Sequence, residues 1–317
     1  MNPRSMLIFD GGIGIVETVR EGLINGKQKA VRPHIRSGLD ARRAYRRGGK
    51  VSNLTWVQGE RPAEKLDETS RKILAAQPSS GTSIFDPVLC ELIYRWFCPT
   101  AGIVLDPFAG GSVRGIVASH IRLQYIGIDL RPEQIAANRE QAARIAKDPH
   151  PVWIVGDSRN IGTLCPNVKA DLVFSCPPYA DLERYSDDPN DLSTMDYPAF
   201  IEAYRAIIKA SCAMLKPNRF AVFVVGDIRD KKGFYRGFVY DTRQAFEDCG
   251  LHLYNDAVLV TAVGSLPIRV GKQFSGGRKL GKTHQNVLVF YNGDPKAIKT
   301  EFSGECQFGE LTEDAVE

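Results

Sequence analysis

Four short segments of this chain carry side chains of the kind that bind ligands, and each follows an apolar run. They are DPFAGGS at residues 106–112, IGIDL at 126–130, VGDS at 155–158 and SCPPY at 175–179. Adjacent glycines let a ligand approach the backbone closely, because no Cβ lies in the way. Carboxylates accept hydrogen bonds from hydroxyl and amino groups. The pattern therefore predicts a ligand site built from the ends of four strands.

The last of these segments also sets where its strand stops. The run ADLVFS is followed directly by two prolines and a tyrosine. Proline has no N–H to donate to a sheet ladder, so the strand must end at Ser175 or Cys176. A rigid Cys-Pro-Pro-Tyr corner after a buried strand is typical of a segment that is aimed at a ligand.

The elements that must position these segments alternate along the chain. Helical patterns from residue 85 onward alternate with apolar strand patterns, and the chain closes with two consecutive strands, YNDAVLVTAV and QNVLVFYNG, joined by a glycine-rich basic loop. This order predicts an α/β fold, with a mostly parallel sheet, helices on both faces and a C-terminal antiparallel hairpin. Ligands of such sheets bind at the carboxyl ends of the strands, which is where the four segments lie.

Composition indicates a globular protein with a packed core. The chain has 317 residues, of which 43% are hydrophobic and 25% charged. We expect an irregular extension at 1–80, one α/β domain at 81–297 and a polar tail at 298–317. No apolar run approaches the ~20 residues of a membrane helix, and we read no signal peptide. Seven widely spaced cysteines without a C-x-x-C pair argue against a zinc site or a disulfide framework, and favour the cytoplasm.

The charge is unevenly distributed. Between residues 27 and 50 there are nine Lys or Arg and one acid, whereas residues 181–196 hold six acids and one Arg. A second basic cluster lies between the last two predicted strands. Such clusters are often solvated surface, but two of them on a nearly neutral chain favour a polyanionic partner, and we expect DNA. The candidate DNA-binding residues are Arg42, Arg43, Arg46, Arg47, Arg269, Lys272, Arg278, Lys279 and Lys282.

The order FAGGS, IGID, VGDS, CPPY resembles the S-adenosylmethionine-dependent methyltransferases. It is most similar to the DNA amino-methyltransferases, which make N6-methyladenine or N4-methylcytosine and carry Asp, Asn or Ser before Pro-Pro and an aromatic residue. The resemblance covers about residues 82–293. It implies a Rossmann-like methyltransferase fold, with a cofactor half at 81–165 and a catalytic half at 166–297, in a site-specific DNA methylase of the kind found in restriction-modification systems.

The resemblance also assigns roles to residues. Phe108 with the glycines would hold the methionine part of S-adenosylmethionine, Asp129 its ribose, and Asp157 with Ser158 its adenine. Tyr179 would stack on a target base swung out of the duplex. The full implied cofactor set is Asp106, Phe108, Ala109, Gly110, Gly111, Asp129, Leu130, Asp157 and Ser158. The implied catalytic set is Cys176, Pro177, Pro178 and Tyr179.

Cys176 departs from the family pattern, because a thiol is a weak hydrogen-bond acceptor. Cys176 can be a tolerated substitute, with the Pro177 carbonyl accepting the amine hydrogens. Ser175 can supply a hydroxyl instead, although strand alternation points it away. Cys176 can also be a nucleophile for cytosine C5 or RNA base methylation, with Asp181 or Glu183 as an acid contact, or the mark of an inert DNA-binding module.

Overall fold

The computed structural model describes residues 6–9, 12–14, 85–180, 185–260 and 266–304, with the backbone alone for 6–9, 12–14, 266–269 and 272. Nine strands form one sheet in the order β2-β1-β8-β9-β7-β6-β3-β4-β5. The strands are β1 (Met6–Phe9), β2 (Gly12–Gly14), β3 (Ile103–Asp106), β4 (Gln124–Asp129), β5 (Val152–Val155), β6 (Ala170–Ser175), β7 (Leu215–Val225), β8 (His252–Val260) and β9 (His284–Asn292). The α-helices are α4 (Pro87–Phe97), α5 (Val113–His120), α6 (Pro132–Ile145), α7 (Ile161–Leu164), α8 (Tyr197–Met214), α9 (Phe238–Glu247), α10 (Leu266–Gly277) and α11 (Ile298–Glu301), and short 3-10 turns lie at η3 (Ser158–Asn160), η5 (Leu192–Thr194) and η6 (Pro295–Ala297).

The seven strands from β3 to β9 have a doubly wound order. Numbered along the chain, they lie as 3-2-1-4-5-7-6, which is the dinucleotide-fold order with the last strand inserted between the fifth and the sixth. The pairs from β5 through β7 are all parallel, and β9 runs antiparallel to both of its neighbours. The predicted α/β fold, with a mostly parallel sheet and a C-terminal antiparallel pair, is therefore confirmed.

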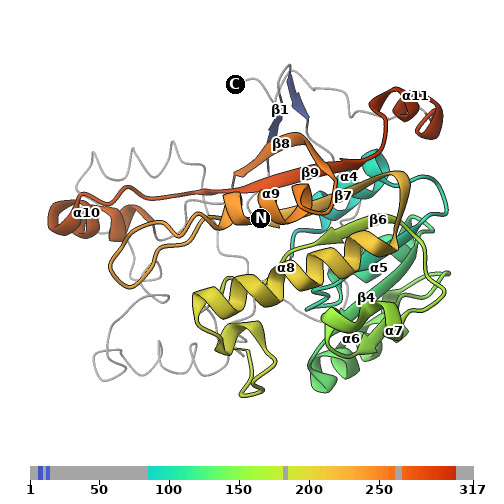
Figure 1. The fold of residues 1–317 in the computed structure, drawn as a ribbon, viewed down its shortest axis with the longest axis horizontal. Coiled ribbons are helices and arrows are strands. Elements are labelled where there is room, and N and C mark those ends of the chain that lie inside the picture. Colours follow the sequence, from blue (N-terminus) through green and yellow to red (C-terminus); the bar gives the residue numbers. More distant parts are fainter. Residues whose placement is uncertain (1–5, 10–11, 15–84, 181–184, 261–265, 305–317) are drawn as a thin grey trace, which may run out of the picture. The chain divides into compact units, whose positions relative to one another are not determined.

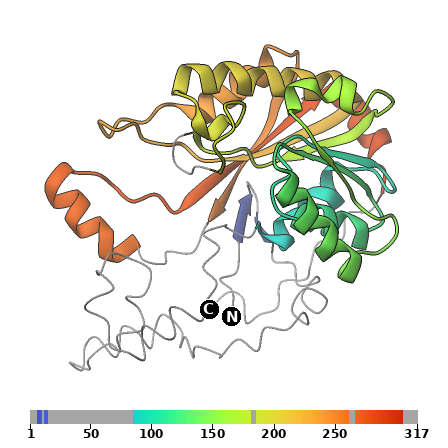
Figure 2. The ribbon, with the colours of Figure 1, turned by 90° about the horizontal axis from the view of Figure 1, so that it is seen from below.

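Helices cover both faces of this sheet, so there are two cores (Figures 1 and 2). On one face, residues of α4, α5 and α6 pack on the sheet, and on the other face residues of α7, α8 and α9 do. The central strand β6 is buried along its whole length, with Leu172 and Phe174 in the first core and Val173 in the second. Burial on both faces explains why residues 172–174, at its centre, are all apolar.

Local signals set the ends of the elements as expected. β6 ends at Ser175, directly before Cys176 and the two prolines. Helix α4 begins after Asp86, whose carboxylate accepts from the N–H groups of Val88 and Leu89 at 2.8 and 3.3 Å. Proline in the first turn of a helix removes only an N–H that has no partner inside the helix, so Pro87 fits there.

The structure adds elements where loops were predicted. β1 and β2, inside the predicted extension, continue the sheet beyond β8. Helix α10 replaces the predicted glycine-rich loop: Val270 and Phe274, four residues apart, share one helical face, a spacing that the neighbouring glycines obscured. Residues 262–283, with α10, belong to a compact unit separate from the one that holds 84–261 and 284–317. Among the described residues, no helix combines the length and apolarity needed to cross a bilayer.

Candidate active site

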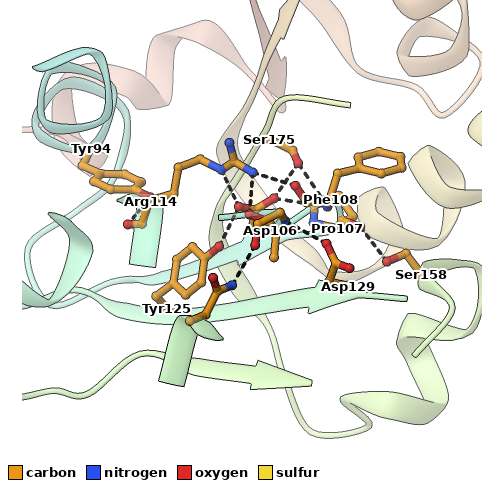
Figure 3. A network of polar contacts seen from close by, with 12 residues as sticks. Tyr94, Asp106, Pro107, Phe108, Arg114, Tyr125, Asp129, Ser158 and Ser175 are labelled. Atoms are coloured by element: carbon orange, nitrogen blue, oxygen red, sulfur yellow. Dashed lines mark hydrogen bonds and ion pairs between the residues drawn. The ribbon is translucent and has the colours of Figure 1, made fainter. Parts of the chain in front are cut away.

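Asp106, the last residue of β3, lies fully buried at the centre of a polar network (Figure 3). Its carboxylate accepts from Arg114 Nε at 2.5 Å, from the Tyr125 hydroxyl at 2.7 Å and from the Ser175 hydroxyl at 2.5 Å. Burial lowers the pKa of Arg114, but the charge of Asp106 outweighs it and holds that pKa above its ordinary value. The carboxylate of Asp106 is engaged with these protein groups and supports the loop from behind, and its contact with a cofactor stays a prediction.

Arg114 extends this support to the loop that follows β3. Its Nη2 donates to the carbonyls of Phe108 at 2.6 Å and Ala109 at 3.0 Å, and its own carbonyl accepts from the Tyr94 hydroxyl at 2.9 Å. The Phe108 N–H donates to the Ser175 hydroxyl at 3.1 Å. Sequence reasoning missed Arg114. The available signal was a cation in the first turn of an otherwise apolar helix, VRGIVASH, eight residues after the strand acid.

The glycine loop is held against the end of β4. Gly110 has a φ of +47°, a left-handed conformation that favours glycine. Its N–H donates to Asp129 Oδ2 at 3.0 Å, and its carbonyl accepts from the buried Asn138 amide at 2.7 Å. A Cβ on Gly111 would meet no atom within 4 Å, so the protein leaves open space at that backbone. This is the kind of approach that a ligand requires.

Asp129 lies at the end of β4, where it was expected. Its side chain is 14% exposed, and its second oxygen accepts from the Arg131 N–H at 2.9 Å, with Arg131 Nε 3.7 Å away. Burial raises the pKa of Asp129 above its ordinary value, and hydrogen bonds from the Arg131 and Gly110 N–H groups counteract part of this rise. Each carboxylate oxygen here keeps a lone pair beyond its backbone partner, so Asp129 can still bind a ligand hydroxyl.

The two residues predicted to contact adenine, Asp157 and Ser158, follow β5 and lie in different environments. The Ser158 hydroxyl is buried and donates to the Pro107 carbonyl at 2.6 Å, which ties this segment to the loop after β3. Asp157 holds the Arg159 guanidinium at 2.5 Å. Burial raises the pKa of Asp157, but the hydrogen bonds and charge of Arg159 outweigh it, so the pKa lies below its ordinary value. Asp157 is therefore a stable carboxylate, whereas the Ser158 hydroxyl is already engaged.

Cys176 is half-buried and Pro177 buried at the fourth strand end. The Cys176 side chain is hydrogen-bonded to Tyr179, and Arg114 acts on it electrostatically. The charge of Arg114 is neutralised by Asp106 at 2.5 Å, so it offers a thiolate little stabilisation. The Ser175 hydroxyl donates to Asp106 and accepts from the Phe108 N–H, and the residue is fully buried. Its hydroxyl is therefore not placed to contact a base.

Tyr179 is held from two sides. The Gln285 side chain on β9 donates to its hydroxyl, and the Phe238 ring lies 6.1 Å away, centroid to centroid, in a T-shaped contact. Burial raises the pKa of Tyr179 well above its ordinary value, so its hydroxyl stays neutral. Asp227, after β7, fixes Phe238 by accepting from its N–H at 3.0 Å. Gln285 and Asp227 were not predicted, because only the fold brings β7 and β9 beside the proline corner.

The predicted DNA-binding residues are placed only in part. Arg42, Arg43, Arg46 and Arg47 lie outside the described residues, as do Asp181 and Glu183. Arg269 and Lys272 belong to α10, where only their backbone is described. Arg278 directly follows that helix, is exposed and lies over the Phe274 ring at 5.1 Å, while Lys279 and Lys282 are half-buried.

An aromatic hairpin at residues 228–236, which sequence reasoning missed, follows the carboxyl end of β7. Phe234 and Tyr235 are 70% and 47% exposed, and Arg229 lies 3.8 Å from the Tyr235 ring centroid. Lys231 and Lys232, at its turn, are exposed. Because β6 and β7 are parallel, the hairpin leaves the sheet at the same edge as the proline corner. The signal was the turn sequence DKKG between IR and FYR.

A hollow of about 770 Å³ lies away from the strand ends described above. It is lined by Ser119, His120, Arg122, Lys147, Asp148 and Pro149. These residues end α5 or precede β5, so the hollow lies at the amino ends of the strands and not at the carboxyl ends. It does not belong to the cluster of strand ends described above.

Comparison with known proteins gives structural similarities only. No family model matches the chain, and no curated protein does. Among solved structures, TrmN from Thermus thermophilus matches with 14% identity and a TM-score of 0.44 over 67% of this chain, which spans 51% of that protein. Magnesium protoporphyrin IX methyltransferase from Synechocystis PCC 6803, solved with bound S-adenosylmethionine, matches with 11% identity and a TM-score of 0.42, over 82% of this chain and all of that one.

Another protein of Thermus thermophilus, provisionally named a DNA modification methylase, matches 50% of this chain and 55% of its own length, with 16% identity and a TM-score of 0.33. Similarities this weak carry no argument about function.

Proposed function

We propose that this chain is an S-adenosylmethionine-dependent methyltransferase that methylates the exocyclic amine of a flipped base in DNA, at adenine N6 or cytosine N4. The observation that carries the proposal is the linkage of the four predicted strand ends. Gly110 binds Asp129, Ser158 binds Pro107, and Ser175 binds both Asp106 and Phe108. Segments chosen from sequence for one ligand thus form one hydrogen-bonded cluster at the carboxyl edge of the sheet.

Groups of this cluster fit the cofactor. Asp129 keeps lone pairs for two ribose hydroxyls, and Asp157, whose two oxygens already accept from Arg159, would accept the adenine amino group as a further donor. The open space at Gly111 suits the methionine part, beside Phe108 and Ala109. When bound, S-adenosylmethionine supplies an electrophilic methyl group on a positively charged sulfur.

The proline corner would prepare the base. The lone pair of an exocyclic amine is conjugated with the ring, so the amine is a poor nucleophile. The Pro177 carbonyl, fixed by two consecutive prolines, accepts one amine hydrogen and draws the nitrogen toward tetrahedral geometry. Tyr179 holds the ring of the flipped base by stacking, worth ~1–3 kcal/mol. Its contacts with Gln285 and Phe238 fix it before the base arrives.

The environment of Cys176 favours the amine chemistry over attack on a ring carbon. A nucleophilic thiolate needs a cation to stabilise it. Arg114, which acts on Cys176, already has its charge paired with Asp106 inside the core. In the amine mechanism Cys176 is at most one weak acceptor, and that role needs no thiolate.

A nucleic acid partner is supported by the aromatic hairpin. It presents two exposed rings and exposed lysines at the carboxyl edge of the sheet, and bases stack on rings while cations bind phosphates. The basic residues Arg278, Lys279 and Lys282 and the arginines of the 27–50 segment would add phosphate contacts.

The test is nucleoside analysis after reaction. Mixed-sequence DNA and, separately, RNA are incubated with the protein and methyl-labelled S-adenosylmethionine, digested and resolved by mass spectrometry. We expect labelled N6-methyladenine or N4-methylcytosine from DNA, and none with Tyr179→Ala. Labelled 5-methylcytosine, or label in RNA alone, would replace the proposal with the C5 or RNA reading. Cofactor binding without any product would indicate an inert module.

A further inference from the structure

Two cysteines that are far apart in sequence lie together on the face of the sheet that α7, α8 and α9 cover. Cys212 is in the last turn of α8, and Cys249 lies just beyond the end of α9. Their side chains are hydrogen-bonded to each other, and both are half-buried. As a thiol, Cys249 also donates to the Ala245 carbonyl at 3.2 Å. Nothing in the proposed methyl transfer uses this pair.

The surroundings of the pair shift the pKa values of the two thiols in opposite directions. The hydrogen bond from Cys212 lowers the pKa of Cys249 to about 7, with smaller lowering effects from Lys209 and Arg205, although burial and Asp248 oppose them. The same hydrogen bond, together with burial, raises the pKa of Cys212. The pKa of Cys249 is thus lowered and that of Cys212 raised, and Cys249 is the one of the two that lines a hollow. This is the asymmetry of an attacking thiol and a resolving thiol.

The pair is also accessible. A hollow of about 260 Å³ lies against Cys249, lined by Arg205, Ala206, Lys209, Ala245 and Asp248. Arg205 and Asp248 are ion-paired at 2.6 Å across it, which leaves Lys209 as a cation at its wall. The space admits a small oxidant. By contrast, Cys90, Cys98 and Cys165 are buried, and burial raises the pKa of each.

We propose that Cys212 and Cys249 form a dithiol modification site that takes a hydroperoxide and closes to a disulfide. The Cys249 thiolate attacks the O–O bond: an S–O bond forms, the O–O bond breaks and hydroxide or an alkoxide leaves, to be protonated by solvent. The sulfur is oxidised by two electrons to a sulfenic acid and the peroxide is reduced. The Cys212 sulfur then attacks Cys249, the S–S bond forms, and the hydroxyl leaves as water with the Cys212 hydrogen.

The experiment uses the full, reduced chain treated with hydrogen peroxide near neutral pH, followed by peptide mass mapping without reductant. We expect one cross-linked peptide pair joining Cys212 to Cys249, two hydrogen masses lighter than the reduced pair and restored by dithiothreitol. In Cys212→Ser, a sulfenic acid trapped by dimedone should persist at Cys249. In Cys249→Ser, Cys212 should not be oxidised faster than the buried cysteines.

An independent probe needs no oxidation. Phenylarsine oxide bridges two adjacent thiols, so the wild type should bind one equivalent and either serine variant should lose that binding. Cys176, which is half-buried and hydrogen-bonded to Tyr179, is the internal comparison. The proposal is overturned if Cys176 is oxidised first, if dimedone labels Cys249 equally with and without Cys212, or if the arsenical binds both variants. Melting curves of the variants, expected to match the wild type, exclude misfolding as the cause.

Discussion

At the scale of single residues, Cys176 separates the possible chemistries. It stands where the family that the sequence resembles carries a better acceptor, and its neighbours give it a hydrogen bond to Tyr179 and a cation that is already neutralised. A side chain in this setting can assist an amine but is poorly prepared for nucleophilic attack.

We expect Cys176→Ser to keep or raise the rate of methyl transfer, because a hydroxyl is a better acceptor than a thiol. Serine cannot replace a thiolate nucleophile, so in the C5 mechanism the rate would fall by several orders of magnitude. Labelled methyl transfer to DNA measures this, with Tyr179→Ala as the control for pocket integrity. Loss of turnover in a folded Cys176→Ser protein that still binds cofactor would contradict the amine mechanism.

If the proposed function is right, Asp129 makes cofactor binding sensitive to acid. Asp129→Ala should weaken S-adenosylmethionine at least tenfold, on the order of 1–3 kcal/mol, because the ribose hydroxyls lose their acceptor. Binding favours the carboxylate, and the folded pKa of Asp129 is raised by burial. Affinity should therefore fall as the pH drops through a value above that of an ordinary aspartate, and Asp129→Asn should remove this dependence. Calorimetric titration across pH measures both; an affinity unchanged in Asp129→Ala would mean that the ribose lies elsewhere.

Gly111 offers a test that leaves the fold untouched. A methyl group there meets no protein atom within 4 Å, and the same holds at Gly162 in α7. Gly111→Ala should therefore leave the melting temperature unchanged but weaken S-adenosylmethionine, because the added Cβ occupies the space of the ligand. Gly162→Ala is the matched control and should change neither. Equal cofactor affinities in the two variants would place the ligand away from Gly111.

At the scale of elements, two kinds of nucleic acid contact can be told apart by salt. Neutralising Arg278, Lys279 and Lys282 together should flatten the log-log salt dependence of DNA binding by roughly 2–3 units, because each phosphate contact releases a counterion. Phe234→Ala in the aromatic hairpin should lower affinity with little change of slope, because stacking carries no charge. Binding titrations over a salt series test both, with the exposed Lys296 and Lys299 neutralised as a control. A weaker triple variant with an unaltered slope would indicate a folding defect.

Prediction from sequence succeeded for elements whose signals are local. The apolar runs, the proline corner and the acids at strand ends are patterns of residues that are neighbours in sequence. The strands and helices that these patterns predicted are present in the fold. Gln285 and the Cys212–Cys249 pair could not be found this way, because their meaning lies in contacts with residues of other elements. Arg114 left a local signal, a cation in the first turn of its helix, but only the fold shows that this cation binds Asp106. The roles of Asp129, Asp157 and Tyr179 stay predictions, because they concern a ligand.

At the scale of the whole molecule, the Asp106 network joins the two halves of the sheet. Arg114→Met would leave Asp106 charged and unpaired in the core, and should destabilise the fold by about 3–5 kcal/mol. Adding Asp106→Asn removes that charge and should restore a good part of the loss. Urea unfolding of the two single variants and the double variant measures the coupling. Additive losses would mean that the pair is not the source of the stability.

The position of β9 determines when the fold can be completed. This strand comes last in sequence among the nine, yet it lies between β7 and β8 and pairs with both. A chain interrupted before residue 284 would leave β7 and β8 without the strand that joins them, each with an open edge able to pair with other chains. During synthesis, half of the sheet must therefore wait for its final strand to leave the ribosome. A premature stop codon just ahead of this strand would thus yield an aggregating product rather than a shortened enzyme.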